Sequence, residues 1–480
     1  MSKTILCKEG YLIPKNHKFD SIIESVKKEL TVEPFKLCSF VKKEEPISFQ
    51  VYQENDEYIN IPKHYGLKKL GKPDENKEVK GAKIKIKFNG DLRPAQKEII
   101  DIVVPHLKLN DGGVLCLPCA AGKTVLSLYL ASLFKVKTLV IVHKTFLLNQ
   151  WKERAEQFTN AAIGIIQQNK IDIEGKDIVI GMLQSIAKDK YDPEIFRDFG
   201  MVIFDEAHHA PSQYFSKALP LIASKITIGL SATPKRADRL EKILYWYFGD
   251  IMYKSIIEEN NKVLVNIVNY NIEHEKFREF KLRTGDINRA KTINKITTIG
   301  RRNKFIIDIM EEVLLEPNRK ILILSDRIEQ LELLKKRIDE REIASTGFYI
   351  GGMKQKNLNI AAEAQVIFAS YGMASEGLDI PDLNTLFMVT PRKEVEQAIG
   401  RITRKLDPNT RPIIYDFTDQ LPSFVRQGYN RRKLYRKMGF ELKIIEVKNN
   451  EIIREIEIDD SNDISKPLVK VDNEHCEFID

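Results

Sequence analysis

The sequence lacks any apolar run of 18 residues, and its start, MSKTILCKEG, has no hydrophobic segment followed by a cleavage site. The first absence excludes an α-helical membrane span, and the second gives no sign of a secretory signal peptide. Cysteine is scarce, with 5 residues in 480, so a disulfide framework is excluded and we expect an intracellular, reducing compartment. Cys116 and Cys119 have C-x-x-C spacing without a second pair, which argues against a four-cysteine zinc site.

A strong excess of charge is also missing. The chain has 76 Lys and Arg against 68 Asp and Glu, a formal net charge of +8, which permits a polyanionic partner without indicating one. Basic residues gather at 426–437, RQGYNRRKLYRK, which is either a nucleic-acid contact or a solvated helix face. The length allows about two to four domains with sizeable cores.

A phosphate-binding loop is predicted at 117–124, LPCAAGKT. An apolar, strand-like run (114–117) precedes it and an apolar, helix-like run (125–134) follows it. In that setting, backbone N–H groups of the loop and of the helix N-terminus face an anion. Lys123 is expected to reach the β- and γ-phosphates, and the Thr124 hydroxyl to bind Mg²⁺. The match is partial, because Leu117 stands where the full motif has its first glycine.

A pair of carboxylates is predicted at the end of a buried strand in VIFDEAHH, residues 202–209. The apolar run 201–204 indicates a parallel strand, and Asp205 and Glu206 follow it directly. Open α/β sheets bind ligands at the carboxyl ends of their strands. An aspartate there can hold Mg²⁺, and the adjacent glutamate can orient or deprotonate an attacking water. Together with the loop, this pair makes nucleotide hydrolysis the leading interpretation.

Alternating strand-like and helix-like segments predict an α/β fold with two doubly wound parallel sheets. The strand candidates are 114–118, 138–143, 177–182, 201–205 and 226–231, then 320–325, 346–351, 365–370, 385–390 and 412–417. We predict a small α+β domain at 1–80, a nucleotide-binding domain at 81–255, a connecting region at 256–300, a second sheet domain at 301–440 and an extension at 441–480.

The second series contains QAIGRITR, residues 397–404. On a helix, Gln397, Arg401 and Arg404 lie on one face. Two guanidinium groups on one stripe suit a triphosphate and stabilise charge that develops on the γ-phosphoryl group, an effect of about 10³-fold or more in rate. The alternative is a solvated helix face with surface ion pairs.

Two loops that follow predicted strands are further candidates. ASYGMASEGLDIP (369–381) includes Gly377 and Asp379, which we expect to line the nucleotide cleft. Ser231-Ala232-Thr233 ends the strand 226–230, and the hydroxyls of Ser231 and Thr233 could couple hydrolysis to another partner. Loops after parallel strands commonly carry function, but helix capping is the alternative for Ser and Thr.

In this order, GKT, DEAH, SAT, SEGLDIP and QAIGRITR resemble a superfamily 2 helicase over about 92–417. The resemblance implies two RecA-like lobes, ATP in the cleft between them and a nucleic-acid strand across their tops. It implies that Gln96, in LRPAQ, contacts adenine and that His208 links hydrolysis to the SAT segment; histidines without a ligand are the alternative. The residues implied to bind or hydrolyse MgATP are Pro118, Cys119, Ala120, Ala121, Gly122, Lys123, Thr124, Asp205, Glu206, Gly377, Asp379, Gln397, Arg401 and Arg404.

Within that superfamily, LPCAAGKT, IVHKTFLLNQW, LRPAQ and KRADRLEKI are most similar to the XPB/UvsW-like branch. The nearest group is identified as the helicases of large cytoplasmic DNA viruses, including the poxvirus transcript-release helicase. The sequence departs from XPB in Ala120 before the GKT and in DEAHH for DEVH. Arg236-Ala237-Asp238 echoes the RED element of XPB only in part, so a similar DNA-opening role is not implied.

Polar residues that follow predicted strands are candidates for contacts to the phosphates of a nucleic-acid strand. In each case helix capping or ordinary loop polarity is the alternative. If the contacts exist, affinity should fall steeply with salt and depend little on base sequence. The candidates are Lys144 and Thr145, Gln184 and Ser185, Ser325 and Arg327, and Ser370 and Tyr371.

The sequence therefore predicts an ATP-dependent helicase or translocase that uses Mg²⁺ and acts on nucleic acid, on DNA rather than RNA. The first hypothesis is a motor in viral transcription, with transcription machinery as a partner, located in the host cytoplasm, virus factories or virion. The second is a repair or recombination motor that anneals or branch-migrates DNA. The third is a degenerate helicase fold that only binds nucleic acid; intact Lys123, Asp205, Glu206, Arg401 and Arg404 argue against it.

Overall fold

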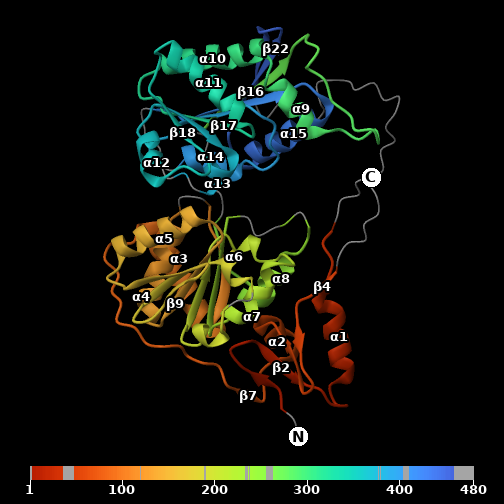
Figure 1. The fold of residues 1–480 in the computed structure, drawn as a ribbon, viewed down its shortest axis with the longest axis vertical. Coiled ribbons are helices and arrows are strands. Elements are labelled where there is room, and N and C mark those ends of the chain that lie inside the picture. Colours follow the sequence, from red (N-terminus) through yellow and green to blue (C-terminus); the bar gives the residue numbers. More distant parts are fainter. Residues whose placement is uncertain are drawn as a thin grey trace. The chain divides into compact units, whose positions relative to one another are not determined.

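The computed structural model describes residues 3–35, 48–118, 121–188, 191–232, 236, 238–255, 263–376, 378, 380–403 and 410–458. The chain divides into two compact units, Met1–Ile256 and Ile257–Asp480. Each contains one eight-stranded sheet with helices on both faces (Figure 1). None of the helices in the described ranges combines the length and apolar character of a membrane-crossing segment.

The described residues 3–35 and 48–76 form a small α+β region of the first unit, in agreement with the predicted fold class. Its five-stranded sheet has the order β5-β6-β2-β1-β7, and β3 pairs with β4 beside it. Helix α1 buries Ile23, Val26 and Leu30 on one stripe against this sheet, the spacing of an amphipathic helix. The elements are β1 (Ile5–Leu6), β2 (Tyr11–Pro14), α1 (Asp20–Leu30), β3 (Thr31–Val32), β4 (Phe49–Gln50), β5 (Gln53–Glu54), β6 (Tyr58–Ile61), α2 (Lys63–Leu70) and β7 (Glu75–Asn76).

The large sheet of the first unit has the strand order β11-β10-β12-β9-β13-β14-β8-β15 and is parallel except for the β10–β11 pair. Its strands are β8 (Gly112–Cys116), β9 (Thr138–Val142), β10 (Ile163–Gln167), β11 (Lys170–Asp172), β12 (Ile178–Met182), β13 (Met201–Phe204), β14 (Ile226–Ser231) and β15 (Ile251–Lys254). The helices are α3 (Pro94–Asn110), α4 (Lys123–Phe134), α5 (Thr145–Phe158), α6 (Leu183–Ile186), α7 (Ala218–Ile222) and α8 (Glu241–Phe248), with 3₁₀ turns at η1 (Pro193–Phe196), η2 (Ala207–His209) and η3 (Phe215–Lys217).

Both faces of this sheet are covered. Helices α3, α4 and α5 lie on one face and α6, α7 and α8 on the other (Figure 1). Successive strand residues alternate between the two cores: Val140 belongs to the first, and Leu139 and Ile141 to the second. Burial on both faces explains why these strands are uninterrupted apolar runs. Because β14 lies between β8 and β13, the ends of these three strands are neighbours.

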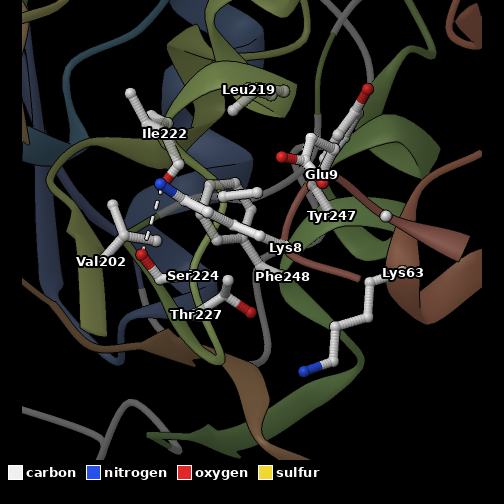
Figure 2. A pocket seen from close by; sticks show the side chains of 12 residues that line it. Lys8, Glu9, Lys63, Val202, Leu219, Ile222, Ser224, Thr227, Tyr247 and Phe248 are labelled. Atoms are coloured by element: carbon white, nitrogen blue, oxygen red, sulfur yellow. Dashed lines mark hydrogen bonds between the residues drawn. The ribbon is translucent and has the colours of Figure 1, made fainter. Parts of the chain in front are cut away.

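The small α+β region packs at the opposite end of the same strands. His64 Nε2 lies 3.1 Å from the Thr227 hydroxyl, near the start of β14, and Lys63 Nζ donates to the Lys225 carbonyl at 2.8 Å. Burial lowers the pKa of His64 to about 3. A cavity of about 20 Å³, room for roughly one water, lies at this boundary, and Figure 2 shows the Lys8 side chain extending across it toward Ile222.

The sheet of the second unit has the order β18-β19-β17-β20-β21-β16-β22-β23 and is parallel except for the β22–β23 hairpin. Its strands are β16 (Leu264–Asn271), β17 (Ile321–Ser325), β18 (Thr346–Tyr349), β19 (Val366–Ser370), β20 (Thr385–Met388), β21 (Ile413–Asp419), β22 (Glu441–Lys448) and β23 (Glu451–Ile458). The helices are α9 (Arg289–Ile296), α10 (Gly300–Leu314), α11 (Ile328–Glu340), α12 (Gln355–Ala362), α13 (Tyr371–Glu376), α14 (Glu396–Ile402) and α15 (Pro422–Lys437).

This second sheet takes strands from outside the segment 301–440. β16 comes from the predicted connecting region, and β22 and β23 come from the predicted extension. β16 lies between β21 and β22: seven of its residues are paired with β21 and all eight with β22. A strand buried in this way is part of the core of the unit.

Only some of the basic residues in the predicted stretch 426–437, which forms most of α15, are exposed to solvent. Arg431 is 2% exposed, and its guanidinium pairs with both carboxylate oxygens of Asp416 at 2.7 Å. The buried Tyr435 hydroxyl donates to Asp416 at 2.8 Å. Gly428 lets the helix approach β21, because a Cβ there would lie 2.7 Å from a methyl carbon of Thr418. The inner face of α15 therefore anchors the helix. Arg432 is half-buried and donates to Asn269 at 2.9 Å, whereas Arg426, Lys433, Arg436 and Lys437 are exposed.

Candidate functional site

The predicted phosphate loop joins β8 to α4. Gly122 caps the helix with φ +86°, and a Cβ there would lie 2.2 Å from Gln96 Nε2 and 3.0 Å from an Arg93 guanidinium nitrogen. Glycine is therefore required for both backbone and space. Lys123 and Thr124 are the first two residues of α4, so their backbone N–H groups belong to a helix N-terminus. This is the geometry that favours anions.

Gln96 holds this loop from α3. Its side chain is 4% exposed; Oε1 accepts from the Arg93 backbone N–H at 3.0 Å, and Nε2 donates to the Ala121 carbonyl at 3.3 Å. One end of the amide thus caps α3, and the other binds the loop at Ala121. A contact between Gln96 and adenine stays a prediction.

Asp205 and Glu206 follow β13, and both are 8% exposed. Asp205 Oδ2 accepts from Trp151 Nε1 at 2.8 Å, and Oδ1 accepts from the Glu206 backbone N–H at 3.0 Å. Glu206 Oε1 lies 3.5 Å from Lys123 Nζ. Burial raises the pKa of Asp205, and the negative charge of Glu206 adds to this, against the opposing effects of Lys123 and Trp151. Two carboxylates and one ammonium thus form one buried cluster beside the loop.

Glu206 has a left-handed backbone conformation, with φ 48° and ψ 52°. Such a conformation is costly for a residue with a Cβ and is concentrated at functional sites. Here it turns the chain from β13 directly into η2. The turn brings the Glu206 side chain back toward Lys123 of the neighbouring loop.

His208 connects this cluster to the end of β14. Its Nδ1 lies 3.3 Å from Glu206 Oε2 and 3.2 Å from the hydroxyl of the fully buried Ser231. The Ser231 carbonyl in turn accepts from the Leu117 N–H at 3.1 Å. The His209 ring packs between two other imidazoles, with centroids 4.3 Å from His208 and 4.1 Å from His143.

The predicted strand contacts of the first unit have different surroundings. Thr145 is exposed at the start of α5, directly after the half-buried Lys144. Gln184 donates to the His143 carbonyl, and the buried Ser185 hydroxyl accepts from the Gln168 N–H at 2.9 Å. Of these four residues Thr145 is the most exposed, and its hydroxyl accepts from Gln167 Nε2 at 3.4 Å.

In the second unit the predicted strand contacts are largely engaged by the unit itself. The buried Ser325 hydroxyl donates to Gln330 Oε1 at 2.8 Å and accepts from the Arg327 N–H at 3.0 Å, which forms a local turn just before α11. Arg327 donates to Asn294 and to the Asp326 carbonyl. Burial raises the pKa of Tyr371, whose hydroxyl donates to the Thr390 carbonyl at 3.0 Å. Ser370 is half-buried at the end of β19.

Helix α14 carries Gln397, which is half-buried, and Arg401, which is 6% exposed. Arg401 Nε donates to the Ala374 carbonyl at 2.6 Å, and Nη1 donates to the Leu378 carbonyl at 2.9 Å. The alternative of a solvated helix face is therefore wrong for Arg401. Six predicted site residues lie outside the described ranges: Cys119, Ala120, Thr233, Gly377, Asp379 and Arg404.

The sequence reasoning missed Trp151 as a site residue. A tryptophan on the apolar side of a helix is typical of the hydrophobic core, and the Trp151 ring is indeed buried with Leu147 and Leu148. The pairing of its N–H with Asp205, 54 residues away, leaves no signal in the local pattern.

Two family descriptions match the chain. "Type III restriction enzyme, res subunit" matches residues 89–236, and "Helicase conserved C-terminal domain" matches residues 302–406. The first range contains the loop, both carboxylates and Ser231, and the second contains α13 and α14. Together with the two sheets, these matches identify an ATP-dependent helicase with tandem RecA-like domains.

Similar proteins narrow the class. A protein of Acanthamoeba polyphaga mimivirus, named provisionally as an ATP-dependent RNA helicase, is 38% identical over 92% of this chain and 86% of its own length. The "DNA 3'-5' translocase XPB2" of Sulfurisphaera tokodaii is 26% identical over 67% of this chain and 80% of its own. The chain belongs to the superfamily 2 helicases, in the viral XPB/UvsW-like branch.

Among solved structures, the fold is similar to that of the Type ISP restriction-modification enzyme LlaBIII bound to DNA. The TM-score is 0.53 at 18% identity, and the match covers 75% of this chain and 32% of that one. At this identity the likeness concerns the fold alone. The chain therefore spans about a third of the length of that enzyme.

Proposed function

We propose that this helicase binds ATP with Mg²⁺ at the loop before α4 and hydrolyses it through the carboxylates of Asp205 and Glu206. The observation that carries the proposal is the buried cluster in which Lys123 Nζ lies 3.5 Å from Glu206 Oε1, with Asp205 adjacent. Its groups follow the carboxyl ends of β8 and β13, which lie on either side of β14, and doubly wound sheets bind nucleotides at this edge.

The donor chemistry of the site fits Mg²⁺. This ion takes hard oxygen ligands, typically one or two carboxylates together with water and substrate phosphates, and Thr124 and Asp205 offer a hydroxyl and a carboxylate. Among the described residues no group of three His, Cys, Asp or Glu forms a larger metal cage. When bound, Mg²⁺ neutralises charge on the phosphate oxygens.

The chain's own groups divide the work in this proposal. Backbone N–H groups of 119–122 and the ammonium of Lys123 bind the phosphates, Pro118 lines the loop without an N–H of its own, and Gln96 contacts adenine. Glu206 orients the attacking water and accepts its proton. His208, with Ser231 and Thr233, transmits the state of the site to the nucleic-acid contacts. Five residues of the second unit are proposed to contribute to nucleotide binding and turnover: Gly377, Asp379, Gln397, Arg401 and Arg404.

We further propose that the nucleic acid is DNA. Support comes from the archaeal relative, whose name describes a DNA translocase. The name of the mimivirus relative favours RNA as the second candidate. In either case Lys144 and Thr145 are proposed to contact strand phosphates, because Thr145 is exposed at the start of α5.

The test compares ATPase rates of the full chain with single-stranded DNA, duplex DNA, forked DNA and RNA at equal nucleotide concentration. We expect DNA to stimulate turnover and RNA to stimulate it less. Lys123→Ala serves as the control that reports contaminating ATPase. Stronger stimulation by RNA than by any DNA would overturn the choice of DNA. No ATPase activity with any of these nucleic acids would overturn the proposal that the protein is an ATP-driven motor.

The biological process is proposed to be transcript release in viral transcription. The alternative from the same motifs is a motor that branch-migrates or anneals DNA. The two predict different preferred substrates, so stalled transcription complexes and four-way DNA junctions should be compared with the same preparation. ATP-dependent release of RNA without junction movement is the expected result; the converse would support the alternative.

A further inference from the structure

Trp151 stands out among the described residues because its indole N–H reaches the catalytic cluster. The side chain is 1% exposed and lies on α5, which covers one face of the first sheet (Figure 1). Its Nε1 donates to Asp205 Oδ2 at 2.8 Å. The ring fills the core beside Leu148 and Ala155, so the position of the N–H is fixed by packing.

The hydrogen bond restricts the orientation of the Asp205 carboxylate. Oδ1 is held by the Glu206 backbone N–H at 3.0 Å, and the Asp205 N–H itself donates to the Ile141 carbonyl of β9 at 2.9 Å. The bond to Trp151 adds a second point of attachment from a different element. Partners of this kind fix a metal ligand's orientation and are worth about 10–100-fold in metal affinity or activity.

The same helix begins at the proposed strand contacts. Thr145 is the first residue of α5, and Trp151 follows six positions later, about 9 Å along the axis. A helix packed on one face against β9, β10 and β12 moves as a unit. A small shift of its exposed N-terminus would therefore also displace the indole of Trp151, and through its hydrogen bond the carboxylate of Asp205.

We propose that Trp151 is a positioning residue that orients the Asp205 carboxylate for Mg²⁺ and couples it to the strand-contacting end of α5. This inference rests on the proposed function, since it uses the nucleotide site and the strand contacts assigned there. It adds a residue and a route of communication that those assignments do not contain. The side chain touches no reacting atom, so its role is indirect.

The chain offers a matched control because it contains only two tryptophans. Trp151→Phe removes the N–H and keeps an aromatic ring. Trp246→Phe makes the same change on α8, where the ring packs 5.5 Å from that of Tyr65, away from the cluster. Each variant keeps one tryptophan, which can be excited selectively over the 16 tyrosines: Trp151 in the Trp246→Phe chain and Trp246 in the Trp151→Phe chain.

The first measurement is intrinsic fluorescence during titration of Mg²⁺ into the full chain with saturating ADP, with calorimetry in parallel. In the Trp246→Phe chain we expect the Trp151 emission to change with the midpoint that calorimetry gives for Mg²⁺. The Trp151→Phe chain should show no such emission change and a midpoint raised about tenfold. An unresponsive Trp151, in a chain that binds Mg–ADP normally, would overturn the proposal.

The second measurement is the ratio of DNA-stimulated to basal ATPase. Trp151→Phe should lower this ratio severalfold, whereas Trp246→Phe should leave it at the wild-type value. If Trp151 only fills space, the Trp151→Phe chain will keep both the Mg²⁺ midpoint and the ratio, and the inference fails while the proposed function stands. If wild type binds no Mg–ADP at all, the proposed function fails and the inference falls with it.

Discussion

Replacing Glu206 by glutamine removes the charge that faces Lys123 and keeps the size of the side chain. The two groups are 3.5 Å apart with side chains only 10% and 12% exposed. At an effective dielectric constant of about 20, unit charges at this distance attract by about 5 kcal/mol. Desolvation of the buried pair offsets most of that attraction. In the proposed site, ATP phosphates compete with Glu206 for the Lys123 ammonium.

Glu206→Gln should therefore change ATP affinity and turnover in opposite directions. ATP should bind about tenfold more tightly, about 1.4 kcal/mol, because the competing carboxylate is gone. The turnover number should fall about 10²–10⁴-fold, because the group that accepts the proton from water is lost. An ATP-induced rise in melting temperature larger than that of wild type would accompany the tighter binding.

The assay combines DNA-stimulated ATPase with calorimetric titration of a non-hydrolysable ATP analogue. Glu194→Gln provides the control, since it removes an exposed carboxylate that pairs with Arg197 at 3.0 Å on the same unit. That variant should match wild type in both measurements. Wild-type turnover in Glu206→Gln, or weaker binding of the analogue, would refute the reasoning.

Three further changes test other parts of the molecule. Lys123→Ala should abolish turnover and weaken ATP binding while the circular dichroism spectrum stays that of wild type. Normal ATP hydrolysis by this variant would show that the loop before α4 is not part of the nucleotide site. Arg404→Ala should lower the turnover number more than nucleotide affinity in steady-state kinetics, and an unchanged rate would count against its role. The pKa of His64 is about 3 in the folded chain, against about 6.5 when the chain is unfolded. The unfolded state therefore takes up the proton first as the pH is lowered. The free energy of unfolding should fall between about pH 6.5 and pH 3, by up to about 1.4 kcal/mol per pH unit. His64→Gln should flatten that slope in urea titrations, and an unchanged slope would mean that His64 is not the group responsible.

Much of the fold follows from local pattern. Short uninterrupted apolar runs such as 138–142 and 321–325, alternating with helix-like segments, are typical of strands covered on both faces, so two doubly wound sheets were predictable. The Gly-Lys-Thr loop and the Asp-Glu pair were predictable as sites for the same reason, since each directly follows such a run. Residues that lie at strand ends are placed by the strand, whatever its neighbours are.

Partners that are distant in the chain were not predictable, because pairing depends on the order of strands in the sheet. From the sequence, Arg431 belonged to a stretch that was either a nucleic-acid contact or a solvated helix face, and it is instead the buried partner of Asp416. β16 looked like a connector and lies inside the second sheet. The local sequence specifies a basic helix in the first case and an apolar strand in the second. It does not specify which other elements pack against them.

The amino-acid order alone thus determined which segments become strands and helices, and which polar residues stand where strands end. The tertiary structure decided which of those ends are neighbours: β14 lies between β8 and β13, so His208 meets both Glu206 and Ser231. It likewise brought Trp151 to Asp205. The physical reason is that backbone periodicity encodes the type and face of an element over a few residues, whereas contacts between elements are selected by packing over the whole sheet.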